Sequence, residues 1–79
     1  MAVKKKRLCD VKCGETVKIV SFTEVSDKSR RIRELGFSPE SSVTCVMQSP
    51  LGDPTAYLVR GSLIALRREH SEKILVEVI

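Results

Sequence analysis

Three short runs of apolar and β-branched residues follow one another between Ser42 and Leu66. The runs cover residues 43–48, 55–59 and 62–66. The chain between them holds the residues that interrupt strands, namely Pro50, Gly52, Pro54 and Gly61. Proline cannot donate a hydrogen bond to a sheet, and glycine can reverse a chain without steric cost. The stretch therefore predicts three consecutive antiparallel strands.

Two more segments, residues 15–22 and 74–79, show the alternation of apolar residues that is typical of strands. A count of about five to six short strands with turn residues between them favours a small closed barrel, in which no sheet edge stays exposed. The sequence therefore predicts a mainly β fold. Since aromatic residues are few, we expect an aliphatic core, to which these residues contribute: Leu58, Ile64, Leu66, Ile74 and Val76.

One segment has the signals of a helix. Ser26 or Asp27 can cap its start, and Gly36 can end it in a left-handed conformation. We expect one short α-helix, inserted between strands, over about residues 27–36. At helical spacing its apolar side should hold Val25, Ile32 and Leu35.

The basic residues are concentrated at the start of the chain. The net charge is +4, and residues 4–7 are four consecutive bases, so residues 8–79 hold ten basic and ten acidic side chains. Residues 1–7 show no periodicity, and we expect a disordered basic tail there, followed by a single domain over residues 8–79. This location of the charge weakens the case for a domain built around polyanion binding. We expect the tail mainly to aid solubility, and the alternative is a weak electrostatic hold on anionic lipid or nucleic acid.

Few residues could carry catalysis or hold a metal. His70 is the single histidine, and one base would have to serve every nucleophile–base pair. Cys9, Cys13, Cys45 and His70 could make a four-ligand metal site, but the spacing is loose and Cys45 alternates with apolar residues. We therefore expect no catalytic residue, no metal, no cofactor and three reduced thiols. No apolar run is long enough for a membrane span or a signal peptide, so we expect a cytoplasmic chain.

The tip between the first two central runs is a candidate surface for a protein partner. Its residues are Pro50, Leu51, Gly52, Asp53 and Pro54. Leu51 could anchor a partner, because an exposed aliphatic on a stiff loop loses little entropy on docking. Alternatively, Leu51 folds back and caps the open end of the barrel. Arg30 and Arg33 of the predicted helix could steer an acidic partner electrostatically.

Several segments, taken in order, resemble the FeoA domain, the small cytosolic component of bacterial ferrous iron uptake. They are Leu8–Glu15, Arg31–Pro39, Pro50–Pro54 and Val59–Arg67. The resemblance implies an SH3-like barrel with a helical insertion. It also implies a non-enzymatic protein-interaction module, whose partner is a FeoB-like membrane permease with a cytosolic GTP-binding domain. Such a module would support or regulate iron uptake, and would be peripheral to the membrane at most through that partner.

The resemblance leaves one alternative and shows two departures. A related barrel is the C-terminal domain of metal-dependent repressors. The alternative is therefore a nucleic-acid-associated or transcription-regulating barrel. If the chain is instead a transport module, we expect it to bind no specific nucleic acid. Cys13 stands where the family usually has proline, and Glu40 stands where glycine usually follows Pro39. Because a type II turn would need a positive φ at residue 40, Glu40 favours a type I turn.

Overall fold

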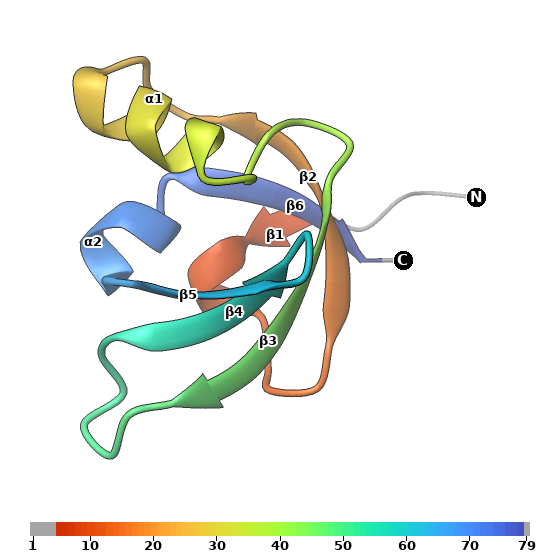
Figure 1. Cartoon of the computed structure of the whole chain (residues 1–79), viewed down its shortest axis with the longest axis vertical. Coiled ribbons are helices and arrows are strands. Elements are labelled where there is room, and N and C mark those ends of the chain that lie inside the picture. Colours follow the sequence, from red (N-terminus) through yellow and green to blue (C-terminus); the bar gives the residue numbers. More distant parts are fainter. Residues whose placement is uncertain (1–4, 79) are drawn as a thin grey trace.

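The computed structural model describes residues 5–78 and contains one antiparallel six-stranded sheet that curls into a barrel (Figure 1). The strands are β1 (Lys5–Arg7), β2 (Thr16–Phe22), β3 (Ser42–Gln48), β4 (Thr55–Val59), β5 (Ser62–Leu66) and β6 (Ile74–Val78). The helices are the 3-10 helix η1 (Leu8–Asp10), α1 (Asp27–Glu34) and α2 (Arg68–Ser71). The mainly β architecture and the inserted helix agree with the sequence-based prediction. None of the helices in residues 5–78 has the length and apolar character that crossing a bilayer requires.

The sheet order is β1-β6-β2-β3-β4-β5, so β1 and β5 are its two edges. Among the described residues these edges do not pair with each other, and the expectation of a barrel closed by strand pairing is wrong. The chain turns into η1 after β1 and into α2 after β5. These two helices contact each other. Helical turns that use their own backbone hydrogen bonds thus take the place of a closing ladder.

The start of the chain is more ordered than the sequence suggests. Lys5, Lys6 and Arg7 form β1, which pairs antiparallel with β6 and sets Lys6 opposite Val76. The Nζ atom of Lys6 also lies 2.9 Å from a carboxylate oxygen of Glu15. The prediction of a disordered tail is therefore wrong for residues 5–7, because strand pairing and an ion pair hold them. The rest of the predicted tail lies outside the described residues.

The core consists of side chains from every strand after β1 and from η1, α1 and the adjoining loops. Its members are Leu8, Val11, Val17, Ile19, Ile32, Phe37, Val43, Cys45, Tyr57, Val59, Leu66, Ile74 and Val76. Three of the predicted core residues, Leu66, Ile74 and Val76, are confirmed, and Ile64 is half-buried. The prediction is wrong for Leu58, which is 43% exposed. In β4 the alternate residues Thr55, Tyr57 and Val59 face inward, so Leu58 faces out.

Helix α1 begins as its sequence predicts. The side chain of Ser26 accepts a hydrogen bond from the backbone N–H of Ser29, and the Ser29 hydroxyl accepts one from the backbone N–H of Ser26. Such reciprocal capping satisfies two backbone donors that the first turn leaves free. The predicted apolar side is only partly confirmed. Ile32 is buried, but Val25 and Leu35 are exposed, because each lies beyond an end of the helix.

Glu40 adopts a positive φ of 75°, so the prediction of a type I turn is wrong. The turn closes with a hydrogen bond of 3.1 Å from the Ser41 N–H to the Ser38 carbonyl. Two contacts with β2 hold Glu40 there: its N–H donates to the Ile19 carbonyl at 2.9 Å, and its carboxylate lies 3.1 Å from Lys18 Nζ. Tertiary contacts therefore impose a backbone conformation that this side chain disfavours.

We expect Glu40→Gly to raise the free energy of unfolding by about 0.5–1 kcal/mol. Glycine adopts a positive φ without steric cost, which outweighs the greater entropy of the unfolded chain and the loss of an exposed ion pair. Urea denaturation measures the change. Glu40→Gln is the control, because it removes the ion pair but keeps the disfavoured φ, and should change stability by less than about 0.5 kcal/mol. A lower denaturation midpoint for Glu40→Gly would contradict the argument.

Candidate interaction surface

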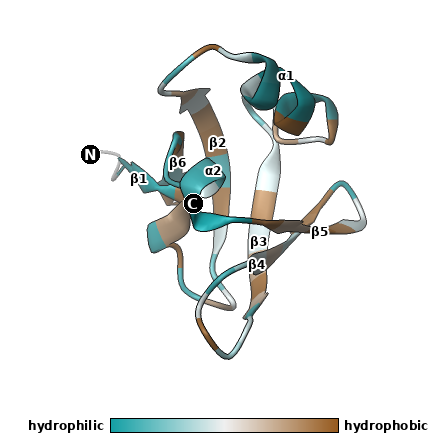
Figure 2. Ribbon diagram, turned by 90° about the vertical axis from the view of Figure 1, so that its left-hand side faces the viewer, coloured by the Kyte–Doolittle hydropathy of each residue, from teal (hydrophilic) through white to brown (hydrophobic). Residues whose placement is uncertain are grey.

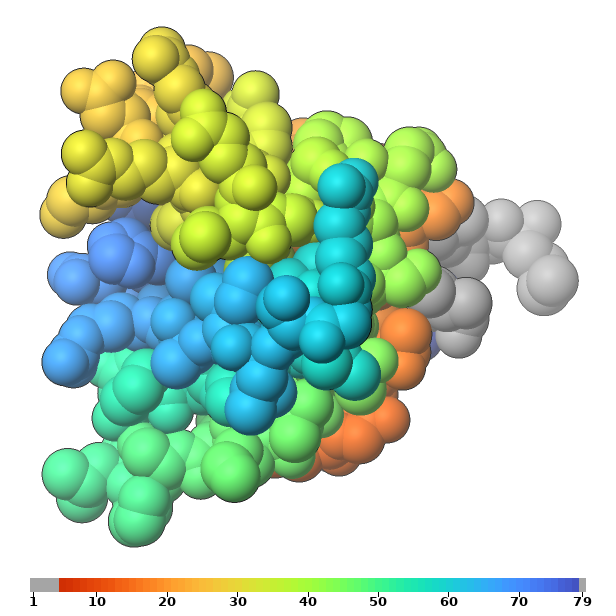
Figure 3. All heavy atoms as spheres, in the orientation of Figure 1, coloured from red at the N-terminus to blue at the C-terminus, as the bar shows by residue number. Residues whose placement is uncertain are grey.

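The loop between β3 and β4, residues 49–54, projects from one end of the molecule (Figures 1 and 3). Its own backbone orders it: the Ser49 N–H donates to the Pro54 carbonyl at 3.1 Å, and the Gly52 N–H donates to the Ser49 carbonyl at 2.8 Å. Gly52 has a φ of 82°, as a reversing tip requires. Leu51 is 94% exposed. The structure therefore does not show the folded-back cap, and the role of Leu51 as an anchor stays a prediction.

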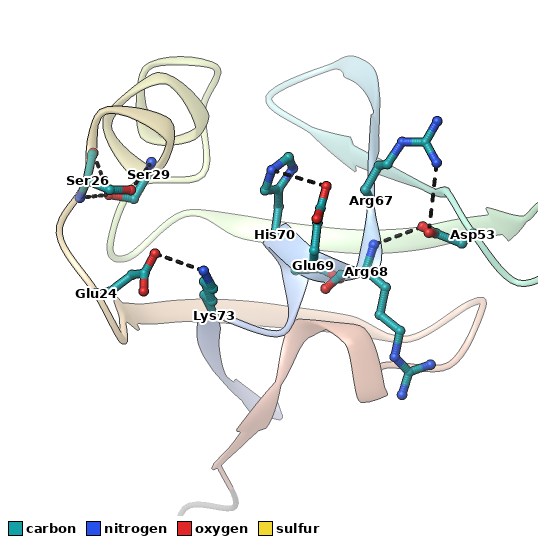
Figure 4. A network of polar contacts seen from close by, with 10 residues as sticks. Glu24, Ser26, Ser29, Asp53, Arg67, Arg68, Glu69, His70 and Lys73 are labelled. Carbon is teal, nitrogen blue, oxygen red and sulfur yellow. Dashed lines mark hydrogen bonds and ion pairs between the residues drawn. The ribbon is translucent and has the colours of Figure 1, made fainter.

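Asp53 fastens this loop to the start of α2 (Figure 4). Its Oδ1 atom accepts a hydrogen bond of 2.8 Å from the backbone N–H of Arg68, and its Oδ2 atom lies 4.0 Å from a guanidinium nitrogen of Arg67. Arg67, at the N-cap position of α2, makes no side-chain cap of its own. Asp53 supplies that cap from another segment, so its carboxylate is already engaged within the domain.

The outward side of β4 and β5 is apolar over two adjacent rows of residues; on β3 the first row continues with Met47 and the second with the polar Thr44. One row sets Met47 beside Ala56 and Ala65, and the other sets Leu58 opposite Leu63. We call these five residues the outer face; Leu63 is 60% exposed and Met47 is exposed as well. Figure 2 shows hydrophobic segments along these strands. Five of the eight large apolar side chains that are exposed in residues 5–78 lie on β3–β5 or on the loop that joins β3 to β4.

Sequence reasoning missed the outer face because both sides of β4 and β5 are apolar. In Thr55–Val59 and Ser62–Leu66 no polar alternation indicates which side is buried. Tyr57 offered one signal, since a large aromatic in a chain with few aromatics is expected in the core. Its inward orientation would have turned Leu58 outward.

The predicted basic residues lie far from the predicted tip. Figures 1 and 2 place α1, which carries Arg30 and Arg33, and the β3–β4 loop at opposite ends of the long axis, along which the molecule extends 36 Å. The Arg33 guanidinium lies over the Phe22 ring, 5.5 Å from its centroid. Such a contact stabilises the packing of α1 on β2. The structure thus does not bring the two halves of the predicted partner site together.

A small cavity lies between α1 and the segment around α2. Its volume is about 30 Å³, and its lining includes Phe22, Ser29, Ile32 and His70. The Nε2 atom of His70 is buried and has no hydrogen-bond partner among the described residues. At the edge of the cavity Lys73 Nζ lies 2.9 Å from Glu24, and this hydrogen bond raises the pKa of Lys73 (Figure 4). A space of this volume holds about one water molecule and is too small for an organic cofactor.

The metal-ligating residue types are dispersed. Over residues 5–78 no group of three or more histidine, cysteine, aspartate or glutamate side chains is placed to hold a metal ion. Cys9 lies beside Asp10, whereas Cys13 contacts Cys45. The imagined four-ligand site of three cysteines and His70 is therefore not assembled.

Comparison with known proteins places this arrangement in a family. The family model described as the FeoA domain matches residues 6–78. A curated relative, the Fe(2+) transport protein A/Fe(2+) transporter FeoB fusion protein of Porphyromonas gingivalis, is 36% identical over 73 residues. The match covers 92% of this chain but only 9% of that protein, so this chain corresponds to a small part of the fusion.

Solved structures agree in fold. The FeoA-like protein of Clostridium acetobutylicum has a TM-score of 0.88 at 30% identity, over all of this chain and 91% of that one. FeoA of Stenotrophomonas maltophilia, a prokaryotic SH3 domain protein solved with zinc, has a TM-score of 0.77 at 26% identity, over 89% and 87% of the two chains. A manganese-dependent transcriptional repressor, at 12% identity, shares the fold alone over 44% of its length, with a TM-score of 0.85.

The matched family model covers nearly the whole chain, and the six-stranded sheet with its inserted helix agrees with the SH3-like structures of that family. This chain therefore belongs to the FeoA domain family of ferrous iron transport.

Proposed function

We propose that this chain is a non-enzymatic, cytoplasmic interaction module that binds a FeoB-type ferrous iron permease and supports or regulates iron import. The observation that carries the proposal is the P. gingivalis relative, in which a domain similar to this chain is fused to FeoB. Fusion holds two domains at a high effective concentration, which is useful when the two make contact. A separate chain must achieve the same contact through a surface of its own.

The outer face and Leu51 are the proposed contact surface. Leu58 and Leu63 lie opposite each other on neighbouring strands, and Leu51 projects from the loop that continues β3 and β4. Clustered exposed apolar side chains of this kind are typical of protein–protein interfaces. Burying a leucine in a partner contributes about 1.5–3 kcal/mol.

Arg30 and Arg33 take a secondary part in this proposal. Because α1 lies at the other end of the long axis, these side chains would touch only a partner that extends along the domain. Their charge can still raise the association rate with an acidic partner at low salt, since electrostatic steering acts over about 10 Å at 0.1 M ionic strength.

The test is direct binding between the chain and the FeoB-type permease of its own genome, held in detergent or in nanodiscs. We expect saturable binding with a dissociation constant of about 10 μM or lower. Deletion of the chain's gene should reduce uptake of labelled ferrous iron, and expression of the chain should restore it. The absence of saturable binding at about 100 μM, together with unchanged uptake in the deletion strain, would overturn the proposal.

The nucleic-acid alternative has less support. Of the basic side chains in the described part of the chain, Lys6, Lys18 and Lys73 each pair with a glutamate. The likeness to transcriptional repressors is one of fold. A titration against duplex DNA at rising salt distinguishes the two functions. Sequence-specific binding that weakens steeply with salt would favour the alternative.

A further inference from the structure

Two thiols, one in the turn that leads into β2 and one in β3, face each other. Cys13 belongs to this turn, and Cys45 belongs to β3. Their sulfur atoms are 3.7 Å apart, and the Cys45 thiol donates a weak hydrogen bond to the Cys13 sulfur. At van der Waals contact, a modest rotation of the side chains is enough to bring two sulfurs within bonding distance.

The backbone holds the two thiols in this arrangement. The Gly14 N–H donates to the Cys45 carbonyl at 2.7 Å, and the Cys45 N–H donates to the Glu15 carbonyl at 3.0 Å. The Glu15 carboxylate in turn accepts hydrogen bonds from the Lys12 N–H at 2.8 Å and from Lys6 Nζ at 2.9 Å. The turn is therefore fastened to β3 on one side and to β1 on the other, and the sulfur–sulfur contact follows from this geometry.

The environments of the two sulfurs differ. Cys45 is fully buried, and burial, followed by the hydrogen bond with Cys13, raises the pKa of its thiol to about 11. Cys45 therefore stays protonated at neutral pH. Cys13 is exposed and can meet an oxidant from solution. Accessible thiols beside a second thiol are typical sites of reversible oxidation.

We propose that Cys13 and Cys45 form a redox modification site that closes to an intramolecular disulfide on reaction with a peroxide. The Cys13 thiol loses its proton to solvent, and the thiolate attacks one oxygen of hydrogen peroxide. This step breaks the O–O bond and gives a sulfenic acid at Cys13 and one hydroxide, which takes up the released proton and becomes water. The Cys45 sulfur then attacks the Cys13 sulfur, which forms the S–S bond and breaks the S–O bond. The second hydroxide takes the Cys45 proton and leaves as water. Two thiols are oxidised by two electrons, and one peroxide is reduced to two waters.

Cys9 provides an internal control. Its sulfur lies 3.8 Å from the Asp10 carboxylate, and its pKa is raised by burial and then by the charge of Asp10. A thiol beside a carboxylate ionises poorly and reacts slowly with peroxide. Cys9 should therefore stay free when the pair closes.

The test treats the native protein with one equivalent of hydrogen peroxide, blocks the remaining thiols by alkylation and maps the tryptic peptides. Cleavage after Lys12 separates Cys9, in peptide 8–12, from Cys13, in peptide 13–18, and Cys45 falls in peptide 34–60. We expect a link between peptides 13–18 and 34–60 that dithiothreitol reverses, and an alkylated peptide 8–12. Cys9→Ser should form the same link. Cys13→Ser, which changes an exposed side chain, should leave Cys45 free.

Two results would overturn the proposal. One is the absence of the 13–45 link in folded protein, with Cys13 stopping at the sulfinic acid. The other is that the three possible cysteine links form in equal yield in folded protein, as they would in protein oxidised in urea. Such a result would show that the thiols pair at random.

Discussion

Phe37→Ala is expected to lower the free energy of unfolding by about 3–5 kcal/mol. Phe37 is fully buried and meets Tyr57 edge to face, with ring centroids 6.2 Å apart and planes at 89°. Its ring connects the turn after α1 to the barrel interior, so its removal leaves a cavity and breaks an aromatic pair. A domain of this size has a stability of about 5 kcal/mol or little more, so most of the variant should be unfolded in moderate urea.

Leu35 offers a matched control two residues earlier in the chain. Its side chain is 53% exposed, and Leu35→Ala should cost less than about 1 kcal/mol. Urea denaturation followed by circular dichroism gives both values. A loss below about 1 kcal/mol for Phe37→Ala would show that Phe37 does not lie in the hydrophobic core.

Much of the fold can be predicted from local chemistry. Ser26 is a good N-cap, and the structure shows the reciprocal capping with Ser29 that begins α1. Gly36 ends the helix at a φ of 123°, where a side chain would be strained. The strands fall where β-branched runs alternate with turn residues. These features depend on a few neighbouring residues, and such local preferences are visible in one sequence.

The sequence-based predictions are wrong where tertiary contacts determine the side-chain orientation or the backbone conformation. The register of β3 shifts between Cys45 and Met47, because Val46 is an extra residue in the pairing with β4. This bulge turns Met47 outward, although simple alternation from Val43 and Cys45 predicts it inside. The prediction of a type I turn at Glu40 is wrong for a related reason, since contacts with β2 hold this residue at a positive φ.

The candidate site was predictable only in part. The proline-bracketed tip can be recognised in the sequence, and its exposure is expected because loops lie at the protein surface. The distance between this tip and Arg30 depends on how the sheet curls, which composition does not determine. The contact between Cys13 and Cys45 joins segments 32 residues apart and likewise needs the pairing of the turn with β3.

The second large effect is expected on binding. The double variant Leu58→Thr/Leu63→Thr removes two neighbouring apolar side chains from the outer face but keeps residues that favour strands. If both leucines become buried against the permease, the dissociation constant of the double variant for the permease should be about ten- to hundredfold higher, since about 1.4 kcal/mol changes a dissociation constant tenfold. The free energy of unfolding of the double variant should fall by less than about 1 kcal/mol, because one cross-strand side-chain pair usually contributes no more than that.

Leu51→Ser and Val25→Thr complete the comparison. Both side chains are almost fully exposed, but Leu51 lies on the β3–β4 loop and Val25 lies just before α1. If Leu51 is an anchor, its loss should weaken binding about tenfold and leave the melting temperature nearly unchanged. Val25→Thr should change neither quantity, because it lies at the opposite end of the domain. Equal losses of binding for Leu51→Ser and Val25→Thr would contradict a contact surface on β3–β5, since one surface patch would not include both ends of the long axis.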